Sequence, residues 1–195
     1  MYALRPKEKI VTKILGIAGS LRKASYNRGL LRASLEVVPK GCQLEVFDLV
    51  GIPVYNEEDE VHIPERVLAF KKAIKAADAI LIATPEYNYS IPGVLKNAID
   101  WASRPYGESA WEKKPVAIMG ASPAIQGTAR AQYHLRQTFV FLNMYPVNQP
   151  EVMVSNAQKR FDQEGKLTDD TTKQLVRQLL SELVNWTKRL SNDAR

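Results

Sequence analysis

The sequence has 195 residues, of which 45% are hydrophobic and 25% charged, which is enough for one domain with a substantial core. Its single cysteine, Cys42, excludes a disulfide framework within the chain and a cysteine-based metal site. The net charge of +6 comes from scattered lysines and arginines without interleaved aromatic residues, so we expect anionic small molecules rather than nucleic acid as partners.

Apolar runs and amphipathic segments alternate along the chain. Strands are expected at 13–18, 79–83 and 116–119, where apolar residues run together, at 43–48, where apolar and polar residues alternate, and within 145–154. Helices are expected where apolar residues recur every three or four positions, at 27–38, 64–77, 92–102, 128–142 and 168–190. Pro146 and Pro150 break the last of these strands. The chain therefore repeats a strand and a helix five times.

This alternation predicts an α/β fold in which helices cover both faces of a parallel sheet. With five strands in a single domain, residues 1–195, the best match is a flavodoxin-like doubly wound sandwich with strand order 2-1-3-4-5. Ligands of such sheets bind beyond the carboxyl ends of the strands, where the strand order reverses between the first and third strands. The loops after the first, third and fourth strands are therefore the expected site.

No apolar run has the length that a membrane span needs. The first residues show no secretory signal, because no apolar stretch follows their charged side chains. We therefore expect a cytoplasmic protein that makes no contact with a membrane. His62 and His134 lie far apart without ligand spacing, so a structural metal is not expected.

The loop after the first strand reads GSLRKASYN and has the composition of a phosphate site. Ser20, Ser25 and Asn27 offer short hydrogen-bonding side chains, and Arg22 and Lys23 add positive charge. The loop leads into a helix N-terminus, whose free N–H groups and dipole favour an anion. The glycine patterns of the P-loop and of dinucleotide-binding folds are both absent. An ordinary capping turn with Asn27 as the N-cap is the alternative interpretation.

The loop after the third strand reads PEYNYSIPG and is stiffened at its ends by Pro85 and Pro92. Tyr87 and Tyr89 offer flat surfaces, and Asn88 offers a donor and an acceptor. A rigid loop of this kind suits a planar heterocycle. A proline-bounded turn that packs a tyrosine at an interface explains the composition equally well.

The loop after the fourth strand, residues 120–127, contains mostly small residues. Ser122 can donate a hydrogen bond, and Gly120 and Gly127 permit a close approach of the backbone. Alone, this composition is only a weak indication of a ligand site. The indication becomes stronger because three loops meet at one switch point. Gly29, in the first turn of the first helix, lowers helix stability, and close packing of that helix on its strand would explain it.

The segments GSLRKASYN and PEYNYSIPGVLKNAIDWASRP together resemble the NAD(P)H-dependent FMN reductase family, in the branch of chromate and quinone reductases and azoreductase-like flavoproteins. The segment RAQYHLRQTFVFLN is similar to the same branch, and the resemblance covers about residues 14–154. It implies a flavodoxin-like fold, non-covalently bound FMN as cofactor and NAD(P)H as co-substrate. It also implies a homo-oligomer, either a dimer or a dimer of dimers.

By this resemblance, the first loop holds the FMN phosphate, the P-E-Y-N segment borders the flavin ring, and a serine of the third loop contributes a further contact. The residues thereby implied in cofactor binding are Ser20, Leu21, Arg22, Lys23, Ala24, Ser25, Tyr26, Asn27, Pro85, Glu86, Tyr87, Asn88 and Ser122. The sequence departs from the family pattern at Pro123 and Gln126, which concerns contacts at the pyrimidine edge of the flavin.

The implied activity is hydride transfer from NAD(P)H through FMN to quinones, azo compounds, free flavins or chromate-like anions, in a ping-pong exchange without a catalytic side chain. A carboxylate beside the flavin would disfavour its anionic reduced form, so we expect Glu86 to turn away and pair with a basic residue or a neighbouring subunit. One alternative is a flavodoxin-type electron carrier, against which the positive charge and Arg22 argue. The other is an interaction protein that senses the flavin redox state.

The large aromatic residues outside the three loops, together with His134, are expected to be structural. We interpret Phe139, Phe141, Trp101 and Trp186 as core or interface residues, and His134 as a residue at a helix interface. No catalytic role is assigned to any of them.

Overall fold

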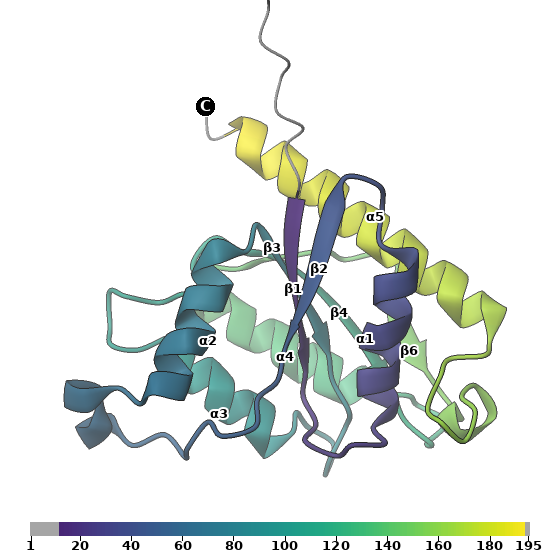
Figure 1. Cartoon of the computed structure of the whole chain (residues 1–195), viewed down its shortest axis with the longest axis horizontal. Coiled ribbons are helices and arrows are strands. Elements are labelled where there is room, and N and C mark those ends of the chain that lie inside the picture. The colour runs from purple at the N-terminus through teal and green to yellow at the C-terminus, as the bar shows by residue number, and fades with distance from the viewer. Residues whose placement is uncertain (1–11, 194–195) are drawn as a thin grey trace, which may run out of the picture.

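The computed structural model describes residues 12–193 and contains one parallel sheet of six strands (Figure 1). The strands lie in the order β2-β1-β3-β4-β5, and β6 also pairs with β4. Their bounds are β1 (Thr12–Ala18), β2 (Cys42–Phe47), β3 (Ala79–Ala83), β4 (Pro115–Ala121), β5 (Tyr145–Pro146) and β6 (Val152–Val154). The predicted order 2-1-3-4-5 is confirmed.

The predicted number of five strands is wrong, because the segment 145–154 forms two short strands instead of one. β5 and β6 both pair in parallel with β4, at opposite ends of that strand. Pro146 and Pro150 lie at the interruption, and proline has no N–H group to donate to a neighbouring strand. The chain therefore leaves the sheet between the two strands.

Five α-helices and two 3₁₀ helices accompany the strands within residues 12–193. They are α1 (Tyr26–Val37), η1 (Glu57–His62), α2 (Glu65–Ala76), α3 (Gly93–Ala102), α4 (Ala129–Phe141), η2 (Ala157–Lys159) and α5 (Asp170–Asp193). The predicted helices are confirmed within three residues at each end. Among the described residues, no helix has the length and apolar character that crossing a membrane requires.

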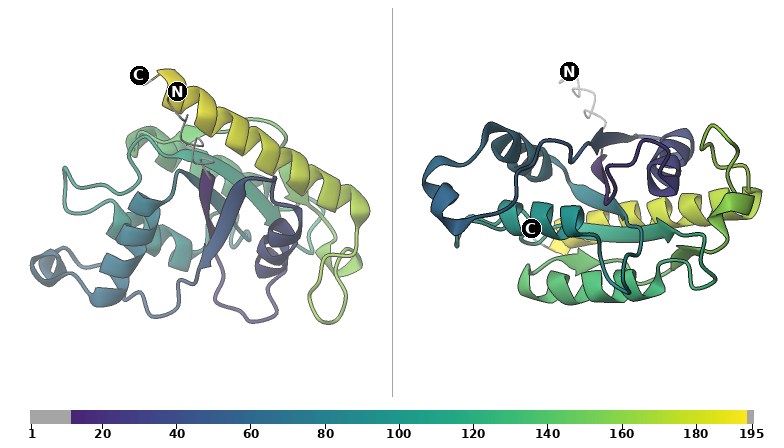
Figure 2. Two further views of the ribbon diagram at one scale, coloured as in Figure 1. Left: turned by 45° about the horizontal axis from the view of Figure 1, so that its top comes forward. Right: turned by 90° about the horizontal axis from the view of Figure 1, so that it is seen from below.

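The helices lie on both faces of the sheet and bury a separate apolar core on each side (Figure 2). On one face, Leu30 of α1 and Leu183 of α5 pack over the sheet. On the other face, Phe70 of α2, Leu95 of α3 and Phe139 of α4 do the same. β3 and β4 are buried at every position, which is why they appear in the sequence as continuous apolar runs, whereas the edge strand β2 is mostly exposed.

The aromatic residues interpreted as core or interface separate into two groups. Trp101 and Phe139 are fully buried, which confirms them as core residues, and Trp186 is half-buried. Phe141 is 75% exposed, so of its two predicted assignments the core of this chain is excluded and an interface stays a prediction. It lies on the solvent side of α4, next to the equally exposed Val140.

The predicted reason for Gly29 is also wrong. A Cβ at this position would lie 2.6 Å from the carbonyl oxygen of Gly165 and 2.8 Å from the ring of Phe161, rather than against the strand. Phe161 also packs on Tyr26, with ring centroids 5.1 Å apart, and Arg32 donates a 2.8 Å hydrogen bond to the Gly165 carbonyl. A segment that follows β6 therefore supports the N-terminal half of α1.

Candidate functional site

A cleft of about 280 Å³ opens at the carboxyl ends of the strands, where the loops after β1, β3 and β4 meet. The right panel of Figure 2 views the molecule from this end. The residues that line the cleft are Arg22, Ser25, Tyr26, Asn27, Pro85, Glu86, Tyr87, Ala121, Ser122 and Pro123. The structure therefore brings the three predicted loops together at the switch point between β1 and β3.

The other predicted site residues lie on the same loops but do not line the cleft. Ser20 is buried beneath the first loop, and Leu21, Lys23, Ala24 and Asn88 are exposed to solvent. For Ser20, a local role is visible, because its hydroxyl oxygen accepts a hydrogen bond of 3.3 Å from the backbone N–H of Arg22.

The first loop ends in a capped helix whose N-terminus points into the cleft. Ser25 is the N-cap of α1, and its hydroxyl oxygen accepts a 3.2 Å hydrogen bond from the N–H of Asn27. The alternative interpretation, with Asn27 as the cap, is therefore wrong. An N-cap serine leaves the other N–H groups of the first turn available to an anion.

Asn27 joins the first loop to the third. Its side chain is 1% exposed, its amide nitrogen donates to the carbonyl of Ala121 at 3.0 Å, and its amide oxygen accepts from the N–H of Ala121 at 2.9 Å. Both ends of the amide are thus used to hold α1 against the end of β4. A contact between Asn27 and a ligand stays a prediction.

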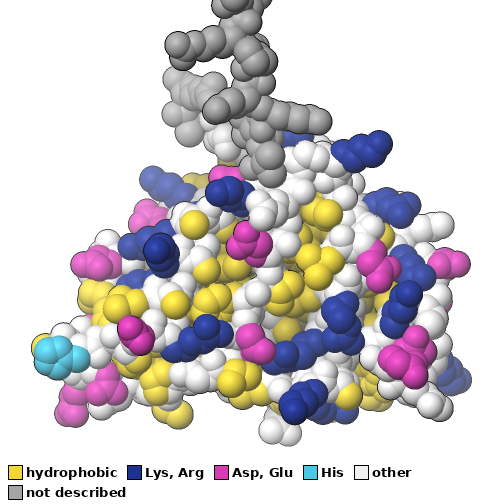
Figure 3. All heavy atoms as spheres, in the orientation of Figure 1, with side chains coloured by type: hydrophobic (Ala, Val, Ile, Leu, Met, Phe, Trp, Pro, Cys, Tyr) yellow, Lys and Arg dark blue, Asp and Glu magenta, His cyan; other side chains and the backbone are white. Residues whose placement is uncertain are grey.

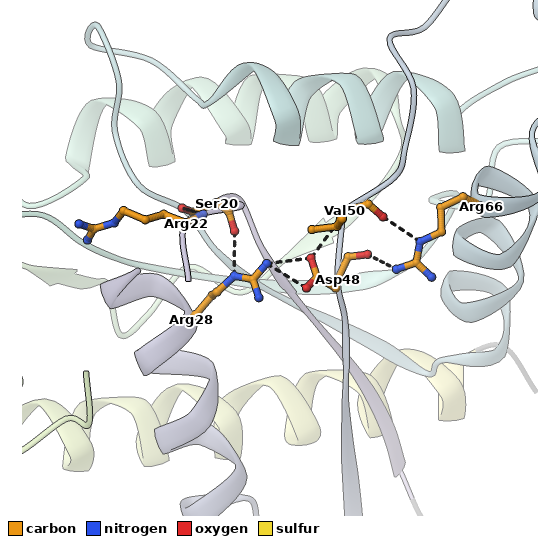
Figure 4. A network of polar contacts seen from close by, with 6 residues as sticks. All are labelled: Ser20, Arg22, Arg28, Asp48, Val50 and Arg66. Atoms are coloured by element: carbon orange, nitrogen blue, oxygen red, sulfur yellow. Dashed lines mark hydrogen bonds and ion pairs between the residues drawn. The ribbon is translucent and has the colours of Figure 1, made fainter. Parts of the chain in front are cut away.

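Two arginines near the first loop have different surroundings (Figure 4). Arg28 forms an ion pair with Asp48, with contacts of 2.8 and 2.9 Å, and donates to the carbonyl of Ser20 at 3.1 Å. Arg22 points away from this pair, forms no ion pair within residues 12–193, and lies 5.6 Å from the ring centroid of Tyr26. The charge of Arg22 is therefore available at the cleft, whereas Asp48 neutralises that of Arg28.

The end of β2 is fixed by a third arginine. Arg66 of α2 donates to the carbonyl of Asp48 and, at 3.1 Å, to that of Val50, and its guanidinium lies 4.2 Å from the ring of Phe47. Sequence reasoning did not identify Arg28, Asp48 or Arg66, since their contacts join separate elements. Figure 3 shows the molecular surface in the orientation of Figure 1. Lys and Arg side chains recur along the lower part of the surface in this view, near the carboxyl ends of β1 and β2.

The loop after β3 forms a tight turn. Tyr87 and Ser90 exchange two backbone hydrogen bonds of 3.0 and 2.9 Å, and the two residues between them, Asn88 and Tyr89, have φ of +50° and +65°. This is the backbone of a two-residue hairpin. His134 of α4 is exposed and has its Nδ1 2.9 Å from the Ser90 hydroxyl, so it contacts this hairpin, and its place at a helix interface stays a prediction. The loop is thus held in a defined conformation.

Glu86 turns toward α4, as expected of a carboxylate that pairs with a basic residue. Its Oε2 accepts hydrogen bonds from the N–H groups of Arg130 and Ala131 at 3.0 and 3.1 Å. Its Oε1 accepts from the guanidinium of Arg130 at 2.5 and 2.6 Å. The prediction that Glu86 finds a basic partner is confirmed. These contacts hold the loop after β3 against the N-terminus of α4.

The loop after β4 lies in close contact with the end of β3. A Cβ at Gly120 would lie 2.0 Å from the hydroxyl of Thr128 and 2.4 Å from the carbonyl oxygen of Thr84. Ser122 lies at the cleft, its N–H donates to the Val154 carbonyl at 3.0 Å, and its hydroxyl accepts from the N–H of Ala124. Gly120, predicted in this loop, lies within β4, and the backbone approaches closely there to Thr84 and Thr128.

The donors at the cleft suit a ligand that carries both a phosphate and a planar ring system. A helix N-terminus, the Ser25 side chain and the free charge of Arg22 suit the phosphate. The hairpin that begins at Tyr87 presents a rigid backbone and an aromatic ring beside them. These groups are those that FMN requires, so the residues present fit this cofactor.

The fold is flavodoxin-like, and the cleft at its switch point offers donors that suit a phosphate-bearing planar ligand. The model of the NADPH-dependent FMN reductase family matches residues 12–159. The chain belongs to this family, and it is accordingly an NAD(P)H-dependent oxidoreductase with FMN as its cofactor.

Individual relatives match most of the chain. An NAD(P)H-dependent FMN reductase of Pseudomonas aeruginosa is 55% identical over 179 residues, which cover 91% of this chain and 96% of that protein. An NAD(P)H:quinone oxidoreductase of Solanum tuberosum is 47% identical over 177 residues, or 87% of this chain and 90% of that protein. The solved structure of FerB, a flavoenzyme NAD(P)H:(acceptor) oxidoreductase from Paracoccus denitrificans, has a TM-score of 0.84 and 34% identity, covering 92% and 98% of the two chains.

Proposed function

We propose that the protein transfers hydride from NAD(P)H to quinones through FMN bound in the cleft between the loops after β1, β3 and β4. The convergence of Arg22, Ser25 and Tyr87 on one cleft is the observation that carries this proposal. The relatives named for quinone reduction support the acceptor class, because they match along most of this chain. Azo compounds, free flavins and chromate-like anions are further acceptors within the proposal.

In this proposal the protein binds and orients, and FMN supplies the ability to accept hydride from one substrate and pass it to another. The first loop, residues 20–27, holds the phosphate through Arg22, Ser25 and the N–H groups of α1. Pro85, Glu86 and Tyr87, which line the cleft, would border the ring, with Asn88 beside them in the hairpin, and Ser122 would contribute a further contact. No side chain of the chain is assigned a proton-transfer step.

Both substrates are proposed to use the same open side of the cleft in turn. NAD(P)H leaves before the acceptor enters, which gives a ping-pong mechanism. The positive charge of the chain attracts NAD(P)H and anionic acceptors. We propose that residues 1–195 act as one domain in the cytoplasm, where this co-substrate is available.

The visible spectrum of the purified protein tests the cofactor assignment. A yellow protein that releases FMN on denaturation and loses its colour under anaerobic NADPH is expected. Initial rates with NADPH and a benzoquinone should then give parallel double-reciprocal lines. A colourless protein that FMN cannot reconstitute contradicts the proposal, and intersecting lines contradict the ping-pong mechanism alone.

Replacing Arg22 with alanine is expected to weaken FMN binding by about 1.5–3 kcal/mol, because a charge-assisted hydrogen bond to the phosphate is lost. Titration of the apoprotein by flavin fluorescence measures the effect. Riboflavin, which lacks the phosphate, serves as the control ligand, and its affinity should stay the same. If the variant keeps the wild-type affinity for FMN, the assignment of Arg22 to the phosphate is wrong.

We further propose that the chain assembles as a dimer or a dimer of dimers through α4. Three large hydrophobic side chains of this helix are exposed, Tyr133 at 51%, Val140 at 83% and Phe141 at 75%. Apolar patches of this kind are typical of interfaces. Light scattering should give a multiple of 21.9 kDa for the wild type and a smaller mass for the V140E/F141E variant. A monomeric wild type contradicts this proposal.

A further inference from the structure

An ion pair between a buried carboxylate and a partly exposed guanidinium forms part of the wall of the cleft that we assign to FMN. Glu86 lines this cleft, and its side chain is only 7% exposed. The carboxylate binds the guanidinium of Arg130 and the first N–H groups of α4. Three sources of charge therefore meet beside the cofactor site, namely a carboxylate, a guanidinium and a helix N-terminus.

These charges nearly balance. A helix N-terminus acts as about half a positive charge, so together with Arg130 it contributes about +1.5. Glu86 reduces this sum to about +0.5. Without the charge of Glu86, the net charge beside the cleft would be about +1.5. Without the charge of Arg130, it would be about −0.5. Because Glu86 is mostly buried, solvent screens these charges less than it would at the surface.

The position of the Arg130 charge is fixed from two directions. Its guanidinium lies between Glu86, at 2.5 Å, and the ring of Tyr89, 3.7 Å from the ring centroid. Tyr89 has φ of +65°, an unusual conformation for a bulky residue, and the stacking on Arg130 helps to offset its cost. The hairpin and α4 thus hold each other, and the charge has a defined place relative to the cleft.

We propose that Glu86 sets the reduction potential of the bound FMN by neutralising Arg130 and the N-terminus of α4. Two-electron reduction at neutral pH leaves the ring system of FMN with one more negative charge than the oxidised form. A positive cleft therefore binds the reduced form more tightly and raises the potential. With its charge in place, Glu86 keeps the potential low, which favours transfer of hydride onward to the acceptor. This inference rests on the proposed cofactor site.

The test compares reduction potentials rather than rates. In the FMN-loaded Glu86→Gln variant, the ratio of the dissociation constants of oxidised and reduced FMN should increase about tenfold. For a two-electron couple this is a rise of about 30 mV in the midpoint, measured by spectroelectrochemical titration. Arg130→Met should lower the midpoint, and the double variant should lie between the two single variants.

A charge change farther along α4 provides the matched control. Arg136 lies on α4, with its side chain donating to the Val147 carbonyl at 2.9 Å, and it does not line the cleft. Arg136→Met should leave the midpoint unchanged. A purely structural role of Glu86 would lower the melting temperature of Glu86→Gln without moving the midpoint.

The outcomes distinguish a failure of this inference from a failure of the proposed function. If the wild type does not bind FMN, the proposed function fails before the inference is reached. If the wild type and both single variants bind FMN with the same midpoint, the inference is overturned and the proposed function stands. If Glu86→Gln does not fold, Arg130→Met decides alone, since its side chain is 33% exposed. An unchanged midpoint in that variant overturns the inference.

Discussion

Replacing Gly120 with alanine is expected to destabilise the protein by about 3 kcal/mol, because the added methyl group has no space. The new Cβ would lie 2.0 Å from the Thr128 hydroxyl and 2.4 Å from the carbonyl oxygen of Thr84. Thr128 and Thr84 are both fully buried, so the backbone of β4 or β3 has to shift. Urea denaturation followed by circular dichroism measures the change in the free energy of unfolding.

Gly93 provides the matched control. A Cβ there meets nothing within 4 Å, and the residue is the first of α3, where alanine is well tolerated. Gly93→Ala should therefore change stability by no more than about 0.5 kcal/mol, or raise it slightly. In the G120A/T128A double variant, the contact with Thr84 remains, so only part of the lost stability should return. Equal stability of G120A and G93A would contradict the tight contact at the end of β4.

Asn27→Ala is expected to lower the free energy of unfolding by about 2–6 kcal/mol. The substitution leaves the N–H and the carbonyl of Ala121 without their partner in a buried position, and each unpaired group costs about 1–3 kcal/mol. Because α1 is then no longer tied to β4, the variant should also bind FMN and riboflavin more weakly to a similar degree. Denaturation and flavin titration measure the two effects separately.

An exposed amide serves as the control for Asn27. Asn148 accepts one hydrogen bond from Arg136 at the surface, so Asn148→Ala should cost less than about 0.5 kcal/mol. If Asn27→Ala is as mild as this control, the amide does not carry the connection between the first and third loops. A loss of FMN affinity without a loss of riboflavin affinity would instead indicate that Asn27 acts on the phosphate.

The fold could be predicted because its causes are local. A strand that is covered on both faces needs an unbroken apolar run, and β3 (Ala79–Ala83) is predicted at its observed bounds for this reason. The alternation of such runs with amphipathic helices is enough to define the sheet order and hence the switch point. Polar residues after two neighbouring strands then indicate the cleft. The separation of β5 from β6 was predicted only in part. The two prolines indicated a break within the segment 145–154, but not two separate strands.

The internal connections of the site could not be predicted, because they join residues that are distant in the sequence. Asn27 and Ala121 are separated by 94 positions, and Glu86 and Arg130 by 44. A short polar side chain near a helix start suits a cap or a phosphate equally well, and only the fold shows that Asn27 binds a strand. For Glu86, chemical reasoning about the flavin predicted a basic partner but could not say which one.

The interruption of the outermost strand has a consequence for how the protein behaves in a crowded solution. A continuous strand at the margin of a sheet presents a row of unpaired N–H and carbonyl groups, on which another chain can grow an intermolecular sheet. Here Pro146 and Pro150 remove two of the donors, and Gln132 and Arg136 of α4 use two of the acceptors, at 3.0 and 2.9 Å. This edge of the sheet is therefore a poor template for fibrillar aggregation.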